Sequence, residues 1–182
     1  TPNTSSAASD VYKRQAFPGG KTTVYEPGLT VPMIAKPVKN TEAGRVNENM
    51  ISLVDLAPTI LEAAGVEYSP KDLHGQSFLG EINANSQTAR DAIYASHTFH
   101  EITMYYPMRV IRNSRYKLIW NIAYGLPYPF ASDLWKAPTW QNIYQQGMSA
   151  KYGQRTVEAY IHRPEFEPVS YTHLTLPTKC WV

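Results

Sequence analysis

Several features that would place a protein in a class at once are missing from this sequence of 182 residues. It contains one cysteine, so it cannot form a disulfide within the chain. No apolar run approaches the roughly 18 residues of a membrane-spanning helix, and the first 15 residues lack the apolar segment of a secretory signal. A net charge of +2 is too small to indicate nucleic acid or a membrane surface. We therefore expect a globular domain without either partner.

The sequence is rich in aromatic side chains. They make up 12% of the residues, with 13 tyrosines and 4 tryptophans. Such amphipathic rings are typical of proteins that contact sugars or that pack many rings together. The length is that of one domain or a large part of one.

The two ends differ from the rest. "SSAASDVYKRQ" (5–15) and "VSYTHLTLPT" (169–178) resemble peptides translated from sequencing-adapter DNA at the edges of metagenomic contigs. We expect residues 1–15 and 168–182 to be such artefacts, which removes Cys180 and His173 from consideration. The alternative is a disordered leader and a threonine-rich edge strand. Without the charged residues of both ends, basic and acidic side chains balance.

Local patterns predict a mixture of helices and strands. Glycine and proline mark a loop over 17–28, and "VPMIAK" (31–36) predicts a buried strand. Residues 50–66 predict a helix, with Asp55 capping the first turn, Leu56 and Ile60 on the apolar face and Gly65 as the stop. We expect Asp55 to be structural.

The second half of the chain predicts a sheet. Strands are expected over 91–96, 106–113 and 115–122, the last two forming a hairpin around Asn113. A short helix is expected near "TWQNIYQQG" (139–147).

"SHTFHEITMYYPMR" (96–109) is the stretch with the most chemistry. His97, His100 and Glu101 could hold a metal ion, could act as general acid or base, or could read the hydroxyl and amino groups of a sugar. Arg109 could bind a carboxylate or sulfate of the substrate, or it could pair with a carboxylate of the protein. The neighbouring Met and Tyr residues suit packing.

Three motifs in order carry a resemblance to a known family. They are "KTTVYEPGLTVPMIA" (21–35), "SLVDLAPTILEAAGV" (52–66) and "LHGQSFL" (73–79). Together they resemble the carboxy-terminal half of the sulfatase family, within the alkaline-phosphatase superfamily. "FPGGKT", the Pro27-Gly28 pair and "HEITMYYPMR" are most similar to the N-sulfoglucosamine (heparan) sulfatase branch. Thr30 departs from the general pattern, in which arginine is common.

The resemblance implies a fold and a division of the chain. We expect an α/β fold, with 16–90 as the end of a mixed-sheet catalytic domain and 91–167 as a truncated, small sheet-and-helix subdomain. The family uses a formylglycine nucleophile, made within a Cys/Ser-x-Pro-x-Arg motif, and a calcium ion held by carboxylates and an asparagine. This chain contains neither that motif nor the calcium ligands. We therefore expect it to be inactive alone and to require the remainder of its own catalytic domain.

The resemblance also ranks the candidate site residues. Lys21 matches the family's basic residue that contacts the sulfate, so we predict it as catalytic. Because the family draws calcium ligands and acid–base histidines from elsewhere, we predict that His100, Glu101, His97 and Arg109 bind substrate and hold no metal.

The predicted function is that of a sulfuric ester or sulfamate hydrolase acting on a glycosaminoglycan-type sugar, with N-sulfoglucosamine as the expected substrate. Family resemblance implies a periplasmic, extracellular or lysosomal location. Two alternatives remain: a non-catalytic carbohydrate-binding module, and a sulfatase or phosphoesterase relative with another substrate.

Overall fold

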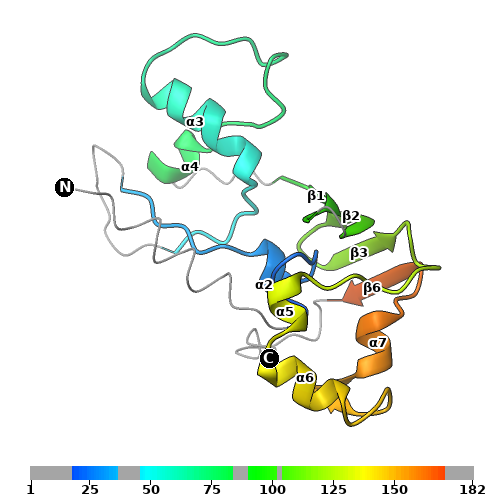
Figure 1. Ribbon diagram of the computed structural model, residues 1–182. Helices are drawn as coiled ribbons and strands as arrows, with labels where there is room; N and C mark the ends of the chain where they lie inside the picture. Colours follow the sequence, from blue (N-terminus) through cyan, green and yellow to red (C-terminus); the bar gives the residue numbers. More distant parts are fainter. Residues whose placement is uncertain (1–17, 37–45, 84–89, 102–103, 171–182) are drawn as a thin grey trace. The chain divides into compact units, whose positions relative to one another are not determined.

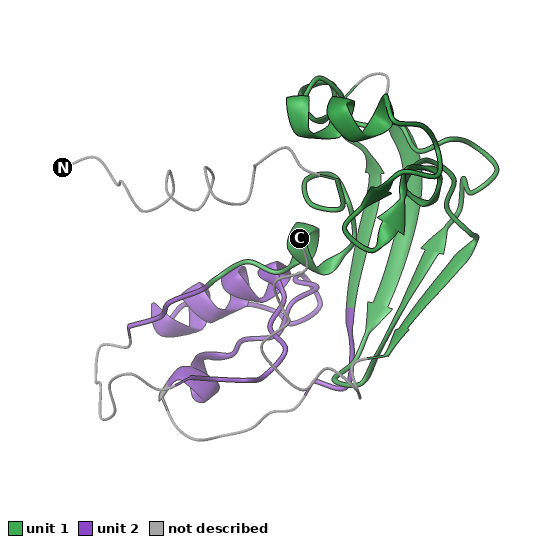
Figure 2. Cartoon of the chain, turned by 90° about the horizontal axis from the view of Figure 1, so that it is seen from below, with its two compact units in different colours: residues 1–32, 94–182 green, residues 33–93 purple. Residues whose placement is uncertain are grey.

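The computed structural model describes residues 18–36, 46–83, 90–101 and 104–170. The chain divides into two compact units, one made of residues 1–32 and 94–182 and the other of residues 33–93 (Figure 2). Within the described ranges, no helix is long and apolar enough to cross a membrane. The predicted adapter-derived ends lie outside these ranges, except for residues 168–170.

A four-stranded sheet with the order β1-β2-β3-β6 organises the larger unit (Figure 1). The strands are β1 (Ile93–Phe99), β2 (Tyr105–Arg112), β3 (Tyr116–Asn121) and β6 (Phe166–Ser170). β3 pairs antiparallel with β2 on one side and with β6 on the other. The three predicted strands are confirmed. β6 ends at Ser170.

The hairpin between β2 and β3 turns at Asn113, as predicted. The Asn113 side-chain oxygen accepts hydrogen bonds from the backbone N–H of Arg115 at 2.9 Å and of Tyr116 at 2.6 Å. Asparagine favours such turns because its short side chain can replace a backbone acceptor. The register that follows places Arg109 opposite Trp120.

The two faces of the sheet differ because successive side chains in a strand point to opposite sides. One face is buried in a core that includes Tyr106, Met108, Val110 and Ile119. The other face leaves large hydrophobic side chains exposed, namely Ile111, Tyr116, Leu118, Trp120 and Phe166. The rings of Trp120 and Phe166 stack on that face at 6.2 Å between centroids.

Short helices complete the larger unit. They are α2 (Glu26–Leu29), α5 (Ser132–Trp135), α6 (Pro138–Tyr144) and α7 (Val157–Ile161), with a small hairpin of β4 (Lys151–Tyr152) and β5 (Arg155–Thr156). Leu134 of α5 joins the core under the sheet, whereas Trp140 of α6 centres a second core with Val157, Tyr160 and Ile161. The helix predicted near 139–147 is thus confirmed, and the expected combination of sheet and helices is present.

The smaller unit contains η1 (Leu53–Asp55), α3 (Leu56–Ala63) and α4 (Leu79–Asn83). Asp55 is buried, but its carboxylate does not cap α3 as predicted. It accepts hydrogen bonds from the backbone N–H of Ser52 at 2.8 Å and of Gln76 at 2.9 Å, and pairs with Arg90 at 2.6 Å. Its role is therefore structural, as predicted. Gly65 ends the helix with a left-handed φ of 68°.

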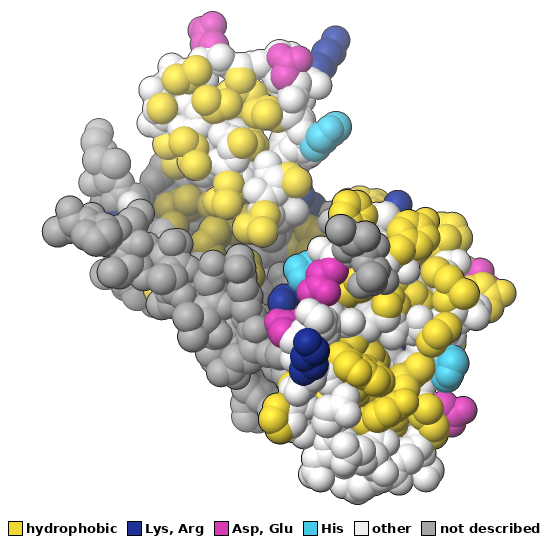
Figure 3. Space-filling model, in the orientation of Figure 1, with side chains coloured by type: hydrophobic (Ala, Val, Ile, Leu, Met, Phe, Trp, Pro, Cys, Tyr) yellow, Lys and Arg dark blue, Asp and Glu magenta, His cyan; other side chains and the backbone are white. Residues whose placement is uncertain are grey.

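The predicted apolar face of α3 is wrong. Pro58 and Thr59 are its buried residues, whereas the Ile60 side chain is 64% exposed. The reason is a polar contact: the Thr59 hydroxyl donates to the Asp55 carbonyl and accepts from the Phe78 N–H. These bonds turn the Thr59 side of the helix inward. Figure 3 shows hydrophobic side chains on the surface of this unit.

The buried strand predicted over 31–36 is also wrong. These residues are irregular and exposed, and Ile34 is 98% exposed. A strand needs a neighbour for its backbone hydrogen bonds, and no described strand pairs with this stretch.

Candidate functional site

Lys21 lies in a tight turn at the start of the larger unit. The Thr23 N–H donates to the Gly20 carbonyl at 3.1 Å, and Thr22 has a left-handed φ of 67°. This conformation is uncommon for a β-branched residue, so surrounding contacts must hold it. The Tyr128 hydroxyl, which donates to the Thr22 carbonyl at 2.8 Å, supplies one of them.

The Lys21 ammonium points to α5. Its Nζ donates to the Asp133 Oδ2 at 2.6 Å, and the two side chains are 21% and 46% exposed. This hydrogen bond is the main reason why the pKa of Asp133 is lowered. The pair is thus a partly exposed ion pair rather than a buried one.

Glu101 contacts the same helix, α5, through Ser132. Its carboxylate accepts from the Ser132 hydroxyl at 3.2 Å and from the Ser132 N–H at 3.4 Å. The Met104 N–H donates to the Glu101 carbonyl at 2.9 Å, and the N–H of the exposed His100 donates to the Met104 carbonyl at 3.2 Å. Lys21 and Glu101 therefore contact consecutive residues of α5.

His97 has a different environment. It lies on β1, half-buried, with Nδ1 at 3.4 Å from the Tyr106 carbonyl oxygen. Its Nε2 is buried, with no hydrogen-bond partner among the described residues. Burial is the main cause that lowers the pKa of His97. The ring thus packs against neighbouring strand β2.

Arg109 lies on the opposite side of the sheet. Met108, its neighbour on β2, is fully buried in the core, so strand alternation directs Arg109 to the exposed face. There its Nη1 donates to the Met108 carbonyl at 3.0 Å. No carboxylate among the described residues pairs with it. The sheet separates Arg109 from α5.

The motif residues Tyr25 and Glu26 anchor the Lys21 loop to the sheet. The Tyr25 hydroxyl donates to Glu167 of β6 at 2.8 Å and accepts from Arg155 at 2.7 Å. Burial raises the pKa of Tyr25 to about 12. Glu26 pairs with the Lys117 ammonium at 2.9 Å and with Arg112 at 3.1 Å.

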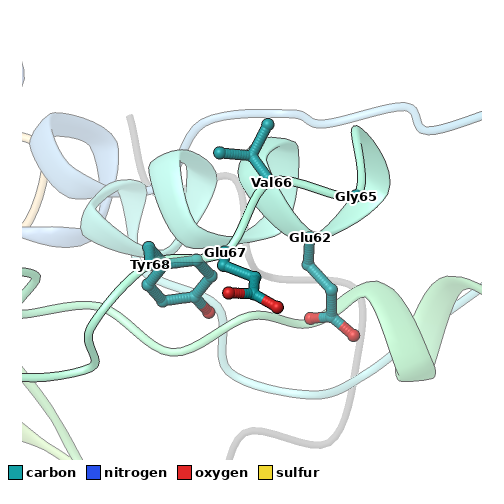
Figure 4. A pocket seen from close by; sticks show the side chains of 5 residues that line it. All are labelled: Glu62, Gly65, Val66, Glu67 and Tyr68. Carbon is teal, nitrogen blue, oxygen red and sulfur yellow. The ribbon is translucent and has the colours of Figure 1, made fainter.

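An aromatic cleft of about 340 Å³ also belongs to the larger unit. Its walls are Pro127, Tyr128, Pro129, Phe130, Trp135, Tyr144, Met148 and Ile161. Trp135 is the last residue of α5, and Tyr128 is the residue that holds the Thr22 turn. The smaller unit has a shallow depression at the end of α3, lined by Glu62, Gly65, Val66, Glu67 and Tyr68 (Figure 4). It contains none of the predicted site residues.

Among the described residues, no group of three or more His, Cys, Asp or Glu side chains lies close enough together to hold a metal ion.

Sequence reasoning missed Ser132 and Asp133. A signal for them existed: "PFASDLW" (129–135) places a serine and an aspartate at the start of a short apolar segment, which is typical of the first turn of a helix. The sequence could not indicate that this turn meets a loop more than a hundred residues earlier.

Comparison with known proteins assigns the family to which this chain belongs. Residues 19–160 match the family model described as "N-sulphoglucosamine sulphohydrolase, C-terminal". The chain therefore belongs to the sulfatase family, and its matched stretch is of the N-sulphoglucosamine sulphohydrolase carboxy-terminal type. This confirms the resemblance drawn from the three motifs.

Individual relatives are also sulfatases. The chain is 33% identical to human N-sulphoglucosamine sulphohydrolase over 136 residues, which are 70% of this chain and 27% of the relative. It is 33% identical to an ulvan-active sulfatase of Formosa agariphila over 113 residues, 61% of this chain and 22% of that one. A solved 2-O GAG sulfatase aligns with 22% identity and a TM-score of 0.35 over 50% of this chain and 22% of that one. The chain thus spans about a quarter of the length of its curated relatives.

Proposed function

We propose that this chain is the carboxy-terminal part of a hydrolase that removes sulfate from a glycosaminoglycan-type sugar, with N-sulfoglucosamine as its substrate. Family membership supports the hydrolase class. The observation that carries the site is the meeting of Lys21 and Glu101 at α5, since it puts a cation for the sulfate beside a carboxylate for the sugar.

In this proposal, Lys21 neutralises charge on the sulfuryl oxygens. Its side chain is long enough to reach an oxyanion from a loop, and a fixed cation favours the negative charge that develops during sulfate transfer. Glu101, with His100 beside it, accepts hydrogen bonds from hydroxyl or amino groups of the sugar. The formylglycine nucleophile and calcium belong to the remainder of the catalytic domain, so this stretch alone is inactive. A periplasmic, extracellular or lysosomal location is part of the same proposal.

His97 and Arg109 have weaker support as substrate ligands. The ring of His97 packs against β2, and Arg109 lies across the sheet from Lys21. Arg109→Ala in the complete enzyme tests whether Arg109 binds the substrate, because replacement of a substrate-binding residue should raise KM.

The central test replaces Lys21 and Glu101 separately in the complete enzyme. Lys21→Ala should lower kcat/KM on every sulfate ester or sulfamate by about a hundredfold or more, as removal of one stabilising donor does elsewhere. Glu101→Ala should lower it for an N-sulfoglucosamine substrate and leave a small aryl sulfate little changed. Near-normal rates for Lys21→Ala would remove Lys21 from the site, and equal loss on both substrates would exclude sugar recognition by Glu101.

A carbohydrate-binding module is the second candidate, and the aromatic cleft beside α5 favours it. Titration of the chain with an N-sulfoglucosamine oligosaccharide, combined with sequencing of the source DNA upstream of Ala16, separates the two. Binding without an upstream Cys/Ser-x-Pro-x-Arg motif would favour the module. A substrate panel on the complete enzyme tests the third possibility, a relative with another substrate.

A further inference from the structure

The first turn of α5 contacts both proposed site residues. Asp133 accepts from the Lys21 ammonium at 2.6 Å, and Ser132 donates to the Glu101 carboxylate through its hydroxyl and its N–H. Lys21 and Glu101 are 80 positions apart in the sequence, so a common support is needed to set the distance between them.

The backbone at Lys21 is already held by other contacts. The hydroxyl of Tyr128 donates to the Thr22 carbonyl, and the Thr22 hydroxyl lies 3.1 Å from the Tyr128 hydroxyl oxygen. What the turn does not determine is the direction of the four-carbon lysine side chain. Among the described residues, Asp133 is the only carboxylate that pairs with its ammonium.

The Lys21–Asp133 contact could be interpreted as an ordinary surface ion pair that stabilises the fold, but such a role does not explain why it lies at the proposed site. Pairs between exposed side chains contribute about 0–1 kcal/mol to stability, and Asp133 is 46% exposed. The pair therefore matters little to folding. Restricting a flexible cation to one direction, in contrast, matters wherever that cation must meet a reacting group.

The local charge also creates a competition for the Lys21 ammonium. Lys21, Asp133 and Glu101 sum to one negative charge, which disfavours a sulfate as long as the ammonium stays with the carboxylate. A sulfate oxygen therefore competes with Asp133 for the Lys21 ammonium. Asp133 thus directs the ammonium before the substrate arrives and competes with the substrate for it.

We propose that Asp133 is a positioning residue for Lys21: it orients the ammonium in the empty site and gives it up to the sulfate group. This inference rests on the proposed function of Lys21. It has a kinetic signature that loss of a merely structural contact lacks, because orientation and competition act in opposite directions on kcat and on binding.

The test measures kcat and KM of the complete enzyme on an N-sulfoglucosamine substrate, and the inhibition constant of inorganic sulfate. Asp133→Ala should lower kcat about tenfold through loss of orientation, while KM and the inhibition constant stay equal or fall. Asp133→Asn keeps an oxygen acceptor for Lys21 and should recover kcat to within about threefold of the parent enzyme. Glu158→Ala, which replaces an exposed carboxylate on α7, is the control and should change neither constant.

A double variant separates this inference from the proposed function. Lys21→Ala with Asp133→Ala should equal Lys21→Ala alone, because Asp133 acts only through Lys21. An unchanged kcat for Asp133→Ala, or a rise in KM that Asp133→Asn does not reverse, would overturn the positioning role. Normal rates for Lys21→Ala itself would overturn the proposed function first.

Discussion

Replacement of Glu26 by alanine should destabilise the larger unit by leaving a buried ammonium without its carboxylate. Lys117 is 2% exposed and donates to the Glu26 Oε1 at 2.9 Å. Removing one partner of a fully buried pair costs about 3–5 kcal/mol. Because the Glu26 side chain is 36% exposed, water screens part of this contact, and we expect about 2 kcal/mol.

The cost should depend on pH in a direction that identifies the cause. Burial lowers the pKa of Lys117, and Glu26 partly opposes that shift. Between the lowered and the ordinary pKa, the unfolded chain binds more protons than the folded one, so stability rises with pH in this window. Glu26→Ala lowers the pKa of Lys117 further. The difference between parent and variant should therefore be largest near neutral pH and should narrow as the pH rises to about 10.

Urea denaturation followed by circular dichroism at both pH values measures this difference. Glu158→Ala, an exposed carboxylate on α7, is the matched control and should change the free energy of unfolding by less than about 0.5 kcal/mol. The double variant Glu26→Ala/Lys117→Met removes the buried charge and should regain most of the loss. If the double variant is no more stable than Glu26→Ala, an unpaired Lys117 is not the reason.

Two further predictions concern buried polar groups of each unit. Burial raises the pKa of Tyr25 to about 12 in the folded chain, above its unfolded value of about 10. Its contribution to stability, on the order of 3 kcal/mol, is therefore present below about pH 10 and is lost as the pH rises through about 12. The stability advantage of the parent over Tyr25→Phe should shrink across this range, and an advantage independent of pH would contradict the prediction. Asp55→Ala leaves Arg90 and two backbone N–H groups without their acceptor, so it should lower the free energy of unfolding by about 3 kcal/mol in chemical denaturation. The control Asp72→Ala, which replaces an exposed carboxylate, should leave this free energy almost unchanged. Equal losses for the two variants would show that the Asp55 contacts do not stabilise the smaller unit.

Local chemistry made the sheet of the larger unit predictable. The hairpin depends on Asn113 and on the alternation of apolar residues around it, and both are visible within a window of about ten residues. The helix around Trp140 and the stop at Gly65 were found in the same way. The face of α3 was not, since a hydrogen bond between Thr59 and Phe78 decides it.

The candidate site likewise combines features that local sequence predicted with features that only tertiary contacts set. The motifs indicated Lys21 and Glu101 as residues with a function, but no local pattern related them to Ser132 and Asp133. Nor did spacing show that Arg109 faces away from them, because this depends on which face of the sheet is buried.

The sequence by itself determined the family and the local elements, since motif order, turn residues and periodicity act over short stretches of chain. Only the tertiary structure decided which elements meet: that α5 supports both Lys21 and Glu101, that Glu26 neutralises a buried lysine of the sheet, and that His97 packs inward. The physical reason is that these contacts depend on where distant segments come together, and the free energy of the whole packed unit sets that arrangement.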